Sequence, residues 1–332
     1  MKTVLCKAFG EPSGLVVEEV DPPPVGRGDV RIRVRAAGVN FPDLLMIRGQ
    51  YQVKPPLPFA PGPETAGEVL EVGPEVEGIA PGDRVMATHP WGGYAEQVVT
   101  RAAAVTPIGE SLSYVEAAAF QLTYGTSYHA LVDRAGLAPG ETLLVTGASG
   151  GVGLTAVELG KVLGATVIAA AGGADKLEVA KRYGADHVID YRSEGLRDRV
   201  KELTGGRGVD VVYDPVGGDV FDQAVRCMEW NGRFLIIGFA AGRIPEFRTN
   251  LALIKGFSLV GVYWGSFAAR DPERNRANFA ALMRWHAEGK VRPLVSATYP
   301  LARASEALVA LAERRSVGKL VITMDEGRGA GA

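Results

Sequence analysis

From about residue 120 onward, short apolar runs alternate with segments whose apolar residues recur at helical spacing. Alternation of this kind is typical of a doubly wound parallel sheet, which binds ligands beyond the carboxyl ends of its strands. The pattern therefore predicts an α/β fold. We expect strands at 142–146, 166–171, 187–190, 209–213, 233–239 and 257–263, with helices between them at 151–163, 174–183, 195–203 and 218–229.

The first third of the chain has a different pattern, with short strand-like runs separated by Gly and Pro turns. In residues 29–36, apolar side chains alternate with three arginines, as in an antiparallel strand with one face in water. A solvated face explains this arginine row better than a basic binding stripe does, because no second basic row flanks it. Further strands are expected at 3–9, 15–20, 64–72, 83–87 and 94–100.

The C-terminal elements do not continue the strand–helix alternation. They comprise helices at 272–288 and 303–313 and a strand at 318–323. We expect this segment to return to the first domain and complete it. The predicted organisation is therefore a domain of residues 1–120 completed by 264–332, and a dinucleotide-binding domain of residues 121–263.

A glycine-rich turn joins the strand at 142–146 to the helix that follows it. The first amides of a helix have no partner within the helix, and the helix dipole is positive there, so a bound phosphate satisfies both. Strand before and helix after make this a strong signal for a Rossmann-type dinucleotide site, although Ala148 occupies the first glycine position of the usual fingerprint. The predicted contacts are Gly147, Ser149, Gly150, Gly151, Val152 and Gly153.

The end of the second strand indicates which nicotinamide cofactor is bound. Enzymes that select NAD place an acidic residue there, but this strand ends in small residues and Gly172. Lys176, Tyr191 and Arg192 follow, and cationic side chains suit a 2′-phosphate. We therefore expect NADPH. The alternative is that Lys176 and Arg192 are ordinary surface residues.

Composition excludes several classes of function. The net charge is −2 and the basic residues are scattered, which argues against a nucleic-acid partner. No apolar run reaches membrane-spanning length, and residues 1–9 do not resemble a secretion signal. The chain has two cysteines, Cys6 and Cys227, in apolar surroundings, so we expect a cytoplasmic location.

The order of motifs along the whole chain resembles the medium-chain dehydrogenase/reductases, and within them the zinc-independent quinone oxidoreductases related to zeta-crystallin. The motifs are Ala37-Gly38-Val39-Asn40-x-x-Asp43, Pro61-Gly62-Pro63-Glu64-x-Ala66-Gly67, Gly92-Gly93-Tyr94-Ala95-Glu96, the glycine turn, Asp214-Pro215-Val216-Gly217-Gly218, Val262-Tyr263-Trp264-Gly265 and Gly318-Lys319. The resemblance implies that the first domain is a mostly β, partly open GroES-like barrel that carries the catalytic residues.

The zinc-dependent relatives have a Cys where Asn40 lies and a His where Pro63 lies. Asn is a poor zinc ligand, and Pro has no side-chain donor. The four histidines are widely separated, and two cysteines are too few for the structural zinc of that branch. We therefore predict no metal site. Without a Lewis acid, the expected reaction is hydride transfer to an acceptor that is already electron-poor.

The resemblance also implies the site residues. It places Asn40 and Thr123 beside the nicotinamide and makes Tyr51 a proton donor. Each has a simpler alternative: Asn40 as a turn cap, Tyr51 packed against the proline-rich loop at 55–63, and Thr123 bonded to its own helix. Strand ends are expected to reach the cofactor through Gly238, Phe239, Tyr263 and Trp264, although Trp264 could equally belong to the core.

The expected activity is that of an NADPH:quinone oxidoreductase acting on small apolar quinones or enones. The alternatives are an enoyl-thioester or 2-alkenal reductase and a crystallin-like protein that binds NADPH without turnover. The apolar strand at 257–263 would lie at the edge of the sheet, where it would pair with a second copy in a homodimer.

Overall fold

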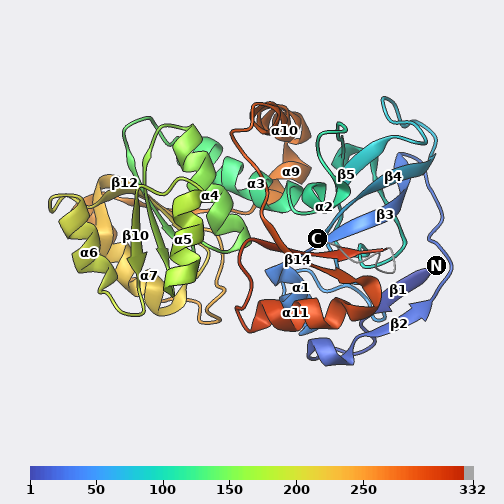
Figure 1. Cartoon of the computed structure of the whole chain (residues 1–332), viewed down its shortest axis with the longest axis horizontal. Helices are drawn as coiled ribbons and strands as arrows, with labels where there is room; N and C mark the ends of the chain where they lie inside the picture. Colours follow the sequence, from blue (N-terminus) through green and yellow to red (C-terminus); the bar gives the residue numbers. More distant parts are fainter. Residues whose placement is uncertain (325–332) are drawn as a thin grey trace. The chain divides into compact units, whose positions relative to one another are not determined.

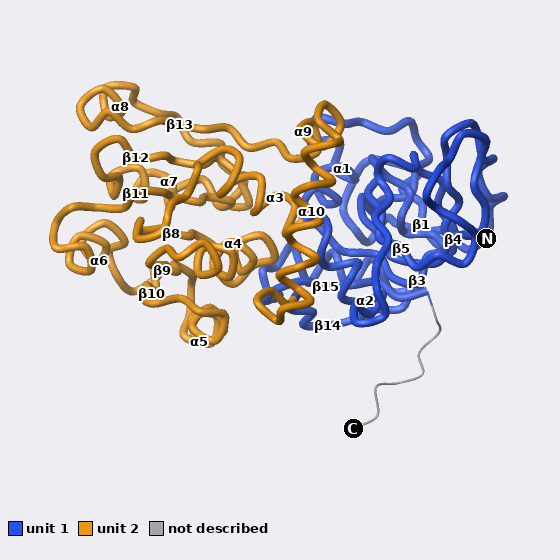
Figure 2. The backbone as a smooth tube through the Cα atoms, turned by 90° about the horizontal axis from the view of Figure 1, so that it is seen from above, with its two compact units in different colours: residues 1–122, 293–332 blue, residues 123–292 orange. Residues whose placement is uncertain are grey.

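A computed structural model describes residues 1–324. The chain forms two compact units, shown in separate colours in Figure 2. Unit 1 contains residues 1–122 and the C-terminal segment from residue 293, and unit 2 contains residues 123–292. The second boundary differs from the predicted one, since residues 264–292 belong to unit 2. The side chain of Trp264 explains this: it packs against Gly125 and Phe279, both within unit 2.

Unit 2 is built on a parallel sheet of six strands in the order β10-β9-β8-β11-β12-β13. Figure 2 labels each of these strands, and Figure 1 shows the same unit from another side. The order reverses between β8 and β11, and open α/β sheets bind their ligands at such a point. The sheet and the α/β class are as predicted. The strands are β8 (Thr142–Thr146), β9 (Thr166–Ala171), β10 (His187–Asp190), β11 (Val209–Asp214), β12 (Met228–Ile236) and β13 (Ser258–Gly261).

Helices cover this sheet and connect its strands. The predicted helix at 218–229 ends early, because Met228 is already extended and pairs with Val209 as the first residue of β12. Among residues 1–324, every helix is too short or too polar to span a bilayer. The helical segments are α3 (Gln121–Tyr128), a π-helical turn (His129–Arg134), α4 (Gly151–Val162), α5 (Ala174–Arg182), α6 (Leu196–Leu203), α7 (Gly218–Ala224), α8 (Asn250–Lys255), α9 (Trp264–Arg270) and α10 (Pro272–Ala287).

Unit 1 contains a largely antiparallel sheet in the order β14-β15-β3-β4-β5-β7, with β6 also paired to β3, and a separate β1-β2 hairpin. Helices α1 (Phe41–Ile47), α2 (Tyr114–Ala117) and α11 (Ala304–Ala312) accompany it. The strands are β1 (Lys2–Leu5), β2 (Val16–Glu19), β3 (Asp29–Val39), β4 (Glu64–Val72), β5 (Arg84–Thr88), β6 (Gln97–Arg101), β7 (Val105–Pro107), β14 (Val295–Pro300) and β15 (Lys319–Thr323).

Strand β3 shows the alternation that the sequence predicts. Its apolar residues from Val30 to Ala36 are buried, and its arginines face glutamates of β4. Arg31 pairs with Glu71 at 3.1 Å, and Arg33 and Arg35 each lie 3.6 Å from Glu68. The arginine row is therefore charge-compensated by the neighbouring strand, as expected for a solvated face rather than a binding stripe.

Candidate functional site

The glycine turn of unit 2 has a backbone that side chains would disrupt. Gly147 has a φ of +55°, and a Cβ atom on Gly153 would lie 2.2 Å from the Gly147 carbonyl oxygen. Gly150 is the N-cap of α4 and provides no side-chain cap for the first amides of the helix. No side chain of the cap residue competes for these amides, and the phosphate site at this turn stays a prediction. Ser149 is buried in the same turn, and Gly151 and Val152 form the first residues of the helix.

The end of β9 lies under an arginine side chain. A Cβ atom on Gly172 would lie 2.5 Å from Nε of Arg192, so a larger residue here would displace the arginine side chain. Tyr191 continues from β10, and its amide donates to the Ala171 carbonyl at 3.3 Å. Lys176 lies in the first turn of α5, where Asp175 is the acidic residue. A guanidinium and an ammonium thus belong to the segments that follow β9 and β10, where a 2′-phosphate would need them.

The loops after β8 and β11 are joined by a buried carboxylate that the sequence analysis did not single out. Thr146 donates its hydroxyl to Oδ1 of Asp214 at 2.5 Å, and the amides of Val216 and Gly217 donate to the same oxygen. Burial raises the pKa of Asp214, against these hydrogen bonds. The side chain is therefore saturated by the ends of its own strands, and its role is to shape the loop. The available signal in the sequence was an Asp at the end of an apolar run, directly before a Pro-Val-Gly-Gly turn.

The other predicted contacts at the strand ends divide into two groups. Gly238 and Phe239 follow β12, and the amide of Gly238 donates to the Asp214 carbonyl at 3.4 Å, which places them beside the same loop. Tyr263 is 50% exposed. Trp264 is instead buried at the start of α9, where its indole N–H donates to Asn275 at 3.0 Å. These contacts favour the core interpretation of Trp264.

Thr123 is buried in α3 and is linked to α4 through hydroxyl groups. The Thr155 hydroxyl lies 3.3 Å from the Thr123 carbonyl and 3.0 Å from the Val152 carbonyl. Ser127 lies 2.8 Å from Thr155 and 2.8 Å from the Tyr213 hydroxyl. This cluster, which we call the hydroxyl network (Ser127, Thr155 and Tyr213), holds α3 against α4 without any charge.

Unit 1 contains a buried polar cluster around Asn40, which we call the ionic cluster (Asn40, Glu64 and Lys319). Antiparallel pairing of Leu320 with Val39 places Lys319 beside Asn40. The Lys319 ammonium lies 2.7 Å from Oδ1 of Asn40 and 2.5 Å from Oε1 of Glu64. Asn40 is the N-cap residue of α1, and its side-chain amide donates to Glu64 and to the Gly38 carbonyl within this cluster.

Two neighbours of the ionic cluster, Gly38 and Leu122, accommodate the carboxylate of Glu64. A Cβ atom on Gly38 would lie 2.3 Å from Oε1 of Glu64 and 2.2 Å from the Ala118 carbonyl, so the carboxylate occupies the space that this glycine leaves open. The second oxygen of Glu64 accepts from the Leu122 amide at 2.9 Å. Asn40 was predicted, whereas Glu64 and Lys319 were noted in the sequence only as parts of motifs.

Asp43 caps the N-terminus of α1 from its buried carboxylate. Its carboxylate accepts from the Asn40 amide at 2.8 Å, the Tyr94 hydroxyl at 2.8 Å and the Gly62 amide at 3.1 Å. Burial raises the pKa of Asp43 to about 6, although these hydrogen bonds favour the charged form. Tyr51, the predicted proton donor, follows α1 and is partly buried against the core of unit 1.

Within residues 1–324, no three His, Cys, Asp or Glu side chains cluster as metal ligands would. At the two positions discussed above, Asn40 is already bound within the ionic cluster and Pro63 has no donor atom. His89 is bonded through both ring nitrogens, at 3.2 Å to Thr65 and 3.0 Å to the Trp91 carbonyl. Burial lowers the pKa of His89 to about 4, so its ring is neutral near pH 7.

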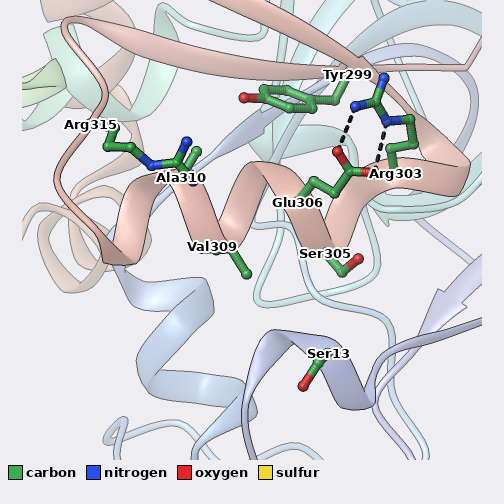
Figure 3. A pocket seen from close by; sticks show the side chains of 8 residues that line it. All are labelled: Ser13, Tyr299, Arg303, Ser305, Glu306, Val309, Ala310 and Arg315. Atoms are coloured by element: carbon green, nitrogen blue, oxygen red, sulfur yellow. Dashed lines mark hydrogen bonds and ion pairs between the residues drawn. The ribbon is translucent and has the colours of Figure 1, made fainter.

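A separate groove of about 400 Å³ lies along α11 in unit 1. Figure 3 shows that Arg303 and Glu306 on its wall pair with each other, with two hydrogen bonds of 2.8 and 2.5 Å. Arg315, also on the wall, pairs with Glu313 at 2.5 Å. The charges of this groove are therefore compensated internally, and none of the predicted site residues lines it.

Comparison with known proteins agrees with the architecture of both units. Residues 26–110 match the alcohol dehydrogenase GroES-like domain, and residues 151–287 match the zinc-binding dehydrogenase domain. A quinone oxidoreductase-like protein 2 homolog from Nematostella vectensis is 42% identical over 97% of this chain and 88% of its own length. The chain belongs to the medium-chain dehydrogenase/reductase family.

Solved structures of this family superpose closely on the chain. A probable oxidoreductase from Mycobacterium abscessus is 41% identical with a TM-score of 0.88, covering 97% of this chain and 98% of that one. The quinone oxidoreductase of Escherichia coli in complex with NADPH is 30% identical with a TM-score of 0.92, covering 97% and 100%. The predicted family, with its quinone oxidoreductase-like relatives, and the predicted fold with a GroES-like domain are thus confirmed. The chain is an oxidoreductase of this family.

Proposed function

We propose that the chain is an NADPH-dependent, zinc-free reductase that transfers hydride to quinones or related α,β-unsaturated carbonyl compounds. The observation that carries the proposal is the pair of strand ends in unit 2. The turn at Gly147–Gly153 gives the first amides of α4 no side-chain cap, and Arg192 lies against Gly172 where an NAD enzyme has a carboxylate. The E. coli relative that is solved with NADPH supports the same assignment.

In this proposal the bound cofactor supplies hydride, and the overall reaction converts a quinone, NADPH and one proton into a hydroquinone and NADP⁺. Amides of Gly151 and Val152 hold the pyrophosphate, and Arg192 with Lys176 holds the 2′-phosphate. Loop 214–217 and the backbone of Gly238 and Phe239 shape the remainder of the cofactor site. Thr123 contacts the nicotinamide, its position set by the hydroxyl network.

Two residues of unit 1 act in the reaction. Asn40 contributes a hydrogen bond to the reacting complex, and Tyr51 gives a proton to the reduced substrate. The acceptor is electron-poor and so needs no Lewis acid, which suits a site with Asn40 and Pro63 at the positions where zinc-dependent relatives have ligands.

The cofactor assignment is tested with steady-state kinetics on a quinone. We expect a lower KM for NADPH than for NADH, and Arg192→Ala to raise the KM for NADPH at least tenfold while leaving that for NADH unchanged. Arg197→Ala, which removes an exposed arginine of α6, is the matched control. Equal KM values for the two cofactors in the unaltered protein would contradict the NADPH assignment. Turnover that disappears on chelation and returns with Zn²⁺ would contradict the zinc-free mechanism.

The substrate class is tested with an acceptor screen at saturating NADPH. Faster turnover of enoyl thioesters than of simple quinones would identify an enoyl-thioester reductase instead. Tight NADPH binding without oxidation by any acceptor would identify a protein that binds the cofactor without turnover. Tyr51→Phe should lower kcat without changing NADPH affinity, since it removes only the phenol hydroxyl. Unchanged kcat would leave Tyr51 as part of the pocket wall.

We also propose a homodimer formed through β13. This strand is the outer strand of the parallel sheet, as predicted, so one row of its backbone groups faces away from the sheet. The adjoining helix α8 exposes Leu253 and Ile254 by 82% and 66%, and Trp230 of β12 is 64% exposed. Apolar exposure on this scale beside an edge strand is typical of an interface. Light scattering should give a dimer mass, and Leu253→Glu/Ile254→Glu should give monomers, whereas Val17→Glu in unit 1 should not.

A further inference from the structure

Two charged residues that the proposed function does not use meet inside unit 1. Glu64 ends the Pro-Gly-Pro-Glu motif, and Lys319 ends the Gly-Lys motif 255 residues later. Their charged atoms lie 2.5 Å apart, and their side chains are 1% and 6% exposed. A charged pair buried to this degree is held by neighbouring polar groups rather than by water. The neighbours here are the backbone of β3, Asn40 and the amide of Leu122.

The hydrogen bonds of Lys319 use all the donors that an ammonium has. Its three hydrogens are directed at Oε1 of Glu64 at 2.5 Å, Oδ1 of Asn40 at 2.7 Å and the Val39 carbonyl at 3.0 Å. Lys319 therefore has no hydrogen left for a ligand. Its effect on a reaction has to pass through the groups that it holds.

The same count determines which way the Asn40 amide faces. Nδ2 donates to Oε1 of Glu64 at 2.9 Å and to the Gly38 carbonyl at 3.2 Å, which uses both of its hydrogens. Exchanging Oδ1 and Nδ2 would set an amide N–H₂ against the Lys319 ammonium and an oxygen against two other oxygens. Every contact of the reversed amide would be repulsive, so the cluster specifies a single orientation.

We propose that Lys319 and Glu64 are positioning residues that fix the polarity of Asn40, so that its amide can accept a hydrogen bond through Oδ1 but cannot donate one. The inference rests on the proposed function, in which Asn40 takes part in hydride transfer. If the polarity is fixed in this way, the group that binds Asn40 in the reacting complex has to be a hydrogen-bond donor, such as a ribose hydroxyl of the cofactor. The carbonyl oxygen of the substrate, which needs a donor, has to be stabilised by another group.

The test uses a double variant, because Lys319→Met alone leaves the buried Glu64 carboxylate without a cation. Glu64→Gln/Lys319→Met removes both charges at nearly constant volume and leaves Asn40 beside an amide that can either donate or accept. Asn40→Ala is the reference for loss of the side chain. Glu18→Gln/Lys7→Met is the matched control, since the Lys7–Glu18 pair has the same 2.5 Å separation but is 51% and 41% exposed.

Hydride transfer is measured in single turnovers at saturating NADPH, together with thermal unfolding. We expect the Glu64→Gln/Lys319→Met variant to unfold within a few degrees of the unaltered protein, to transfer hydride at least tenfold more slowly, and to keep its KM for quinone. Its rate should lie near that of Asn40→Ala, and the control variant should be unaffected. A normal rate in Glu64→Gln/Lys319→Met beside a slow Asn40→Ala would overturn the proposal. A normal rate in Asn40→Ala would overturn it as well, while leaving the reductase function intact.

A second readout does not depend on activity. In the unaltered protein both side-chain N–H hydrogens of Asn40, assigned by their absence in Asn40→Ala, should be protected from exchange with solvent in ¹H–¹⁵N spectra. In Glu64→Gln/Lys319→Met the protection should be lost. Rapid exchange in the unaltered protein would overturn the proposal even if the chain is an active reductase. Protection in a chain that reduces no acceptor would uphold the fixed amide and reject the proposed function alone.

Discussion

Each unit buries a glutamate bonded through both carboxylate oxygens, and the two differ in the groups that face them. In unit 1, Glu64 faces the ammonium of Lys319. In unit 2, Glu158 of α4 accepts from the Tyr124 hydroxyl at 2.5 Å and from the Arg292 amide at 3.0 Å. The Arg292 guanidinium lies over the ring of Tyr183 instead, 5.5 Å from its centroid. One carboxylate thus contacts a full positive charge, whereas the other accepts hydrogen bonds from neutral donors and has only the more distant charge of Arg292 nearby.

This difference has consequences for protonation and for stability. Burial raises the pKa of Glu158 to about 7, and the hydrogen bonds from Tyr124 and Arg292 only partly offset this effect. Glu158 therefore changes its charge near neutral pH. Its two donors adjoin the residues at which the chain passes between the units, 122/123 and 292/293. The hydroxyl network of unit 2 is a third buried polar site, and it has no charged member.

The largest effect is expected where a buried charge loses its partner. Lys319→Met leaves the Glu64 carboxylate unpaired in the core, which should lower the free energy of unfolding by about 3–5 kcal/mol. Lys7→Met breaks the Lys7–Glu18 pair of the same length on the surface and should cost about 1 kcal/mol or less. Denaturant unfolding at pH 7 measures both. Equal losses in the two variants would show that burial does not distinguish these pairs.

The sequence predicted the elements that have a local signal and missed some of those that do not. In unit 2, β8, β9 and β10 have the predicted bounds, because apolar runs and flanking glycines are local signals. Helices α8 and α9 and strand β14 were missed. Leu253 and Ile254 of α8 are exposed, so this helix lacks the apolar periodicity of an element packed on a core. The residues of β14 do alternate, with Val295, Ala297 and Tyr299 less exposed than Ser296 and Thr298, but the strand has only six residues.

The candidate site divides along similar lines. The glycine turn was predictable because strand, turn and helix adjoin in the sequence. The partners of Asn40 were not, since the pairing of Lys319 with Glu64 depends on the register between β15 and β3. A charged residue at the head of the apolar run Leu320–Thr323 was the only local indication. The burial of Trp264 could not be predicted either, because it depends on a tertiary contact: the indole fills the space that Gly125 leaves open.

A smaller effect, and one that varies with pH, is expected at Glu158. The folded state binds the proton more tightly than the unfolded state, in which the pKa is near 4.5. Stability is therefore lost as the pH rises from about 4.5 to about 7, by about 3 kcal/mol in total. Glu158→Gln keeps an acceptor for the Arg292 amide and avoids this loss. The variant should match the unaltered protein at pH 4.5 and exceed it by about 3 kcal/mol at pH 8.

Urea unfolding of both proteins from pH 4.5 to 8 gives this difference directly. Burial also raises the pKa of Asp43 and of Asp214, but these residues are common to both proteins, so their contributions cancel. A stability difference that is constant over this pH range would show that Glu158 does not titrate there. A difference that grows toward low pH would show that the carboxylate is held in its charged form.

The smallest effect is expected in the hydroxyl network. Tyr213→Phe removes one neutral hydrogen bond, while Ser127 keeps its contacts with Thr155 and with the Val152 carbonyl at 3.0 Å. No buried donor or acceptor is left without a partner at Ser127, so the loss should be about 1 kcal/mol and the same at pH 5 and pH 8. Urea unfolding at the two pH values measures it. A loss above 3 kcal/mol would mean that the uncharged network stabilises α3 as strongly as the ionic cluster stabilises β3. The size of the stability loss at these three sites would then not follow from their charge.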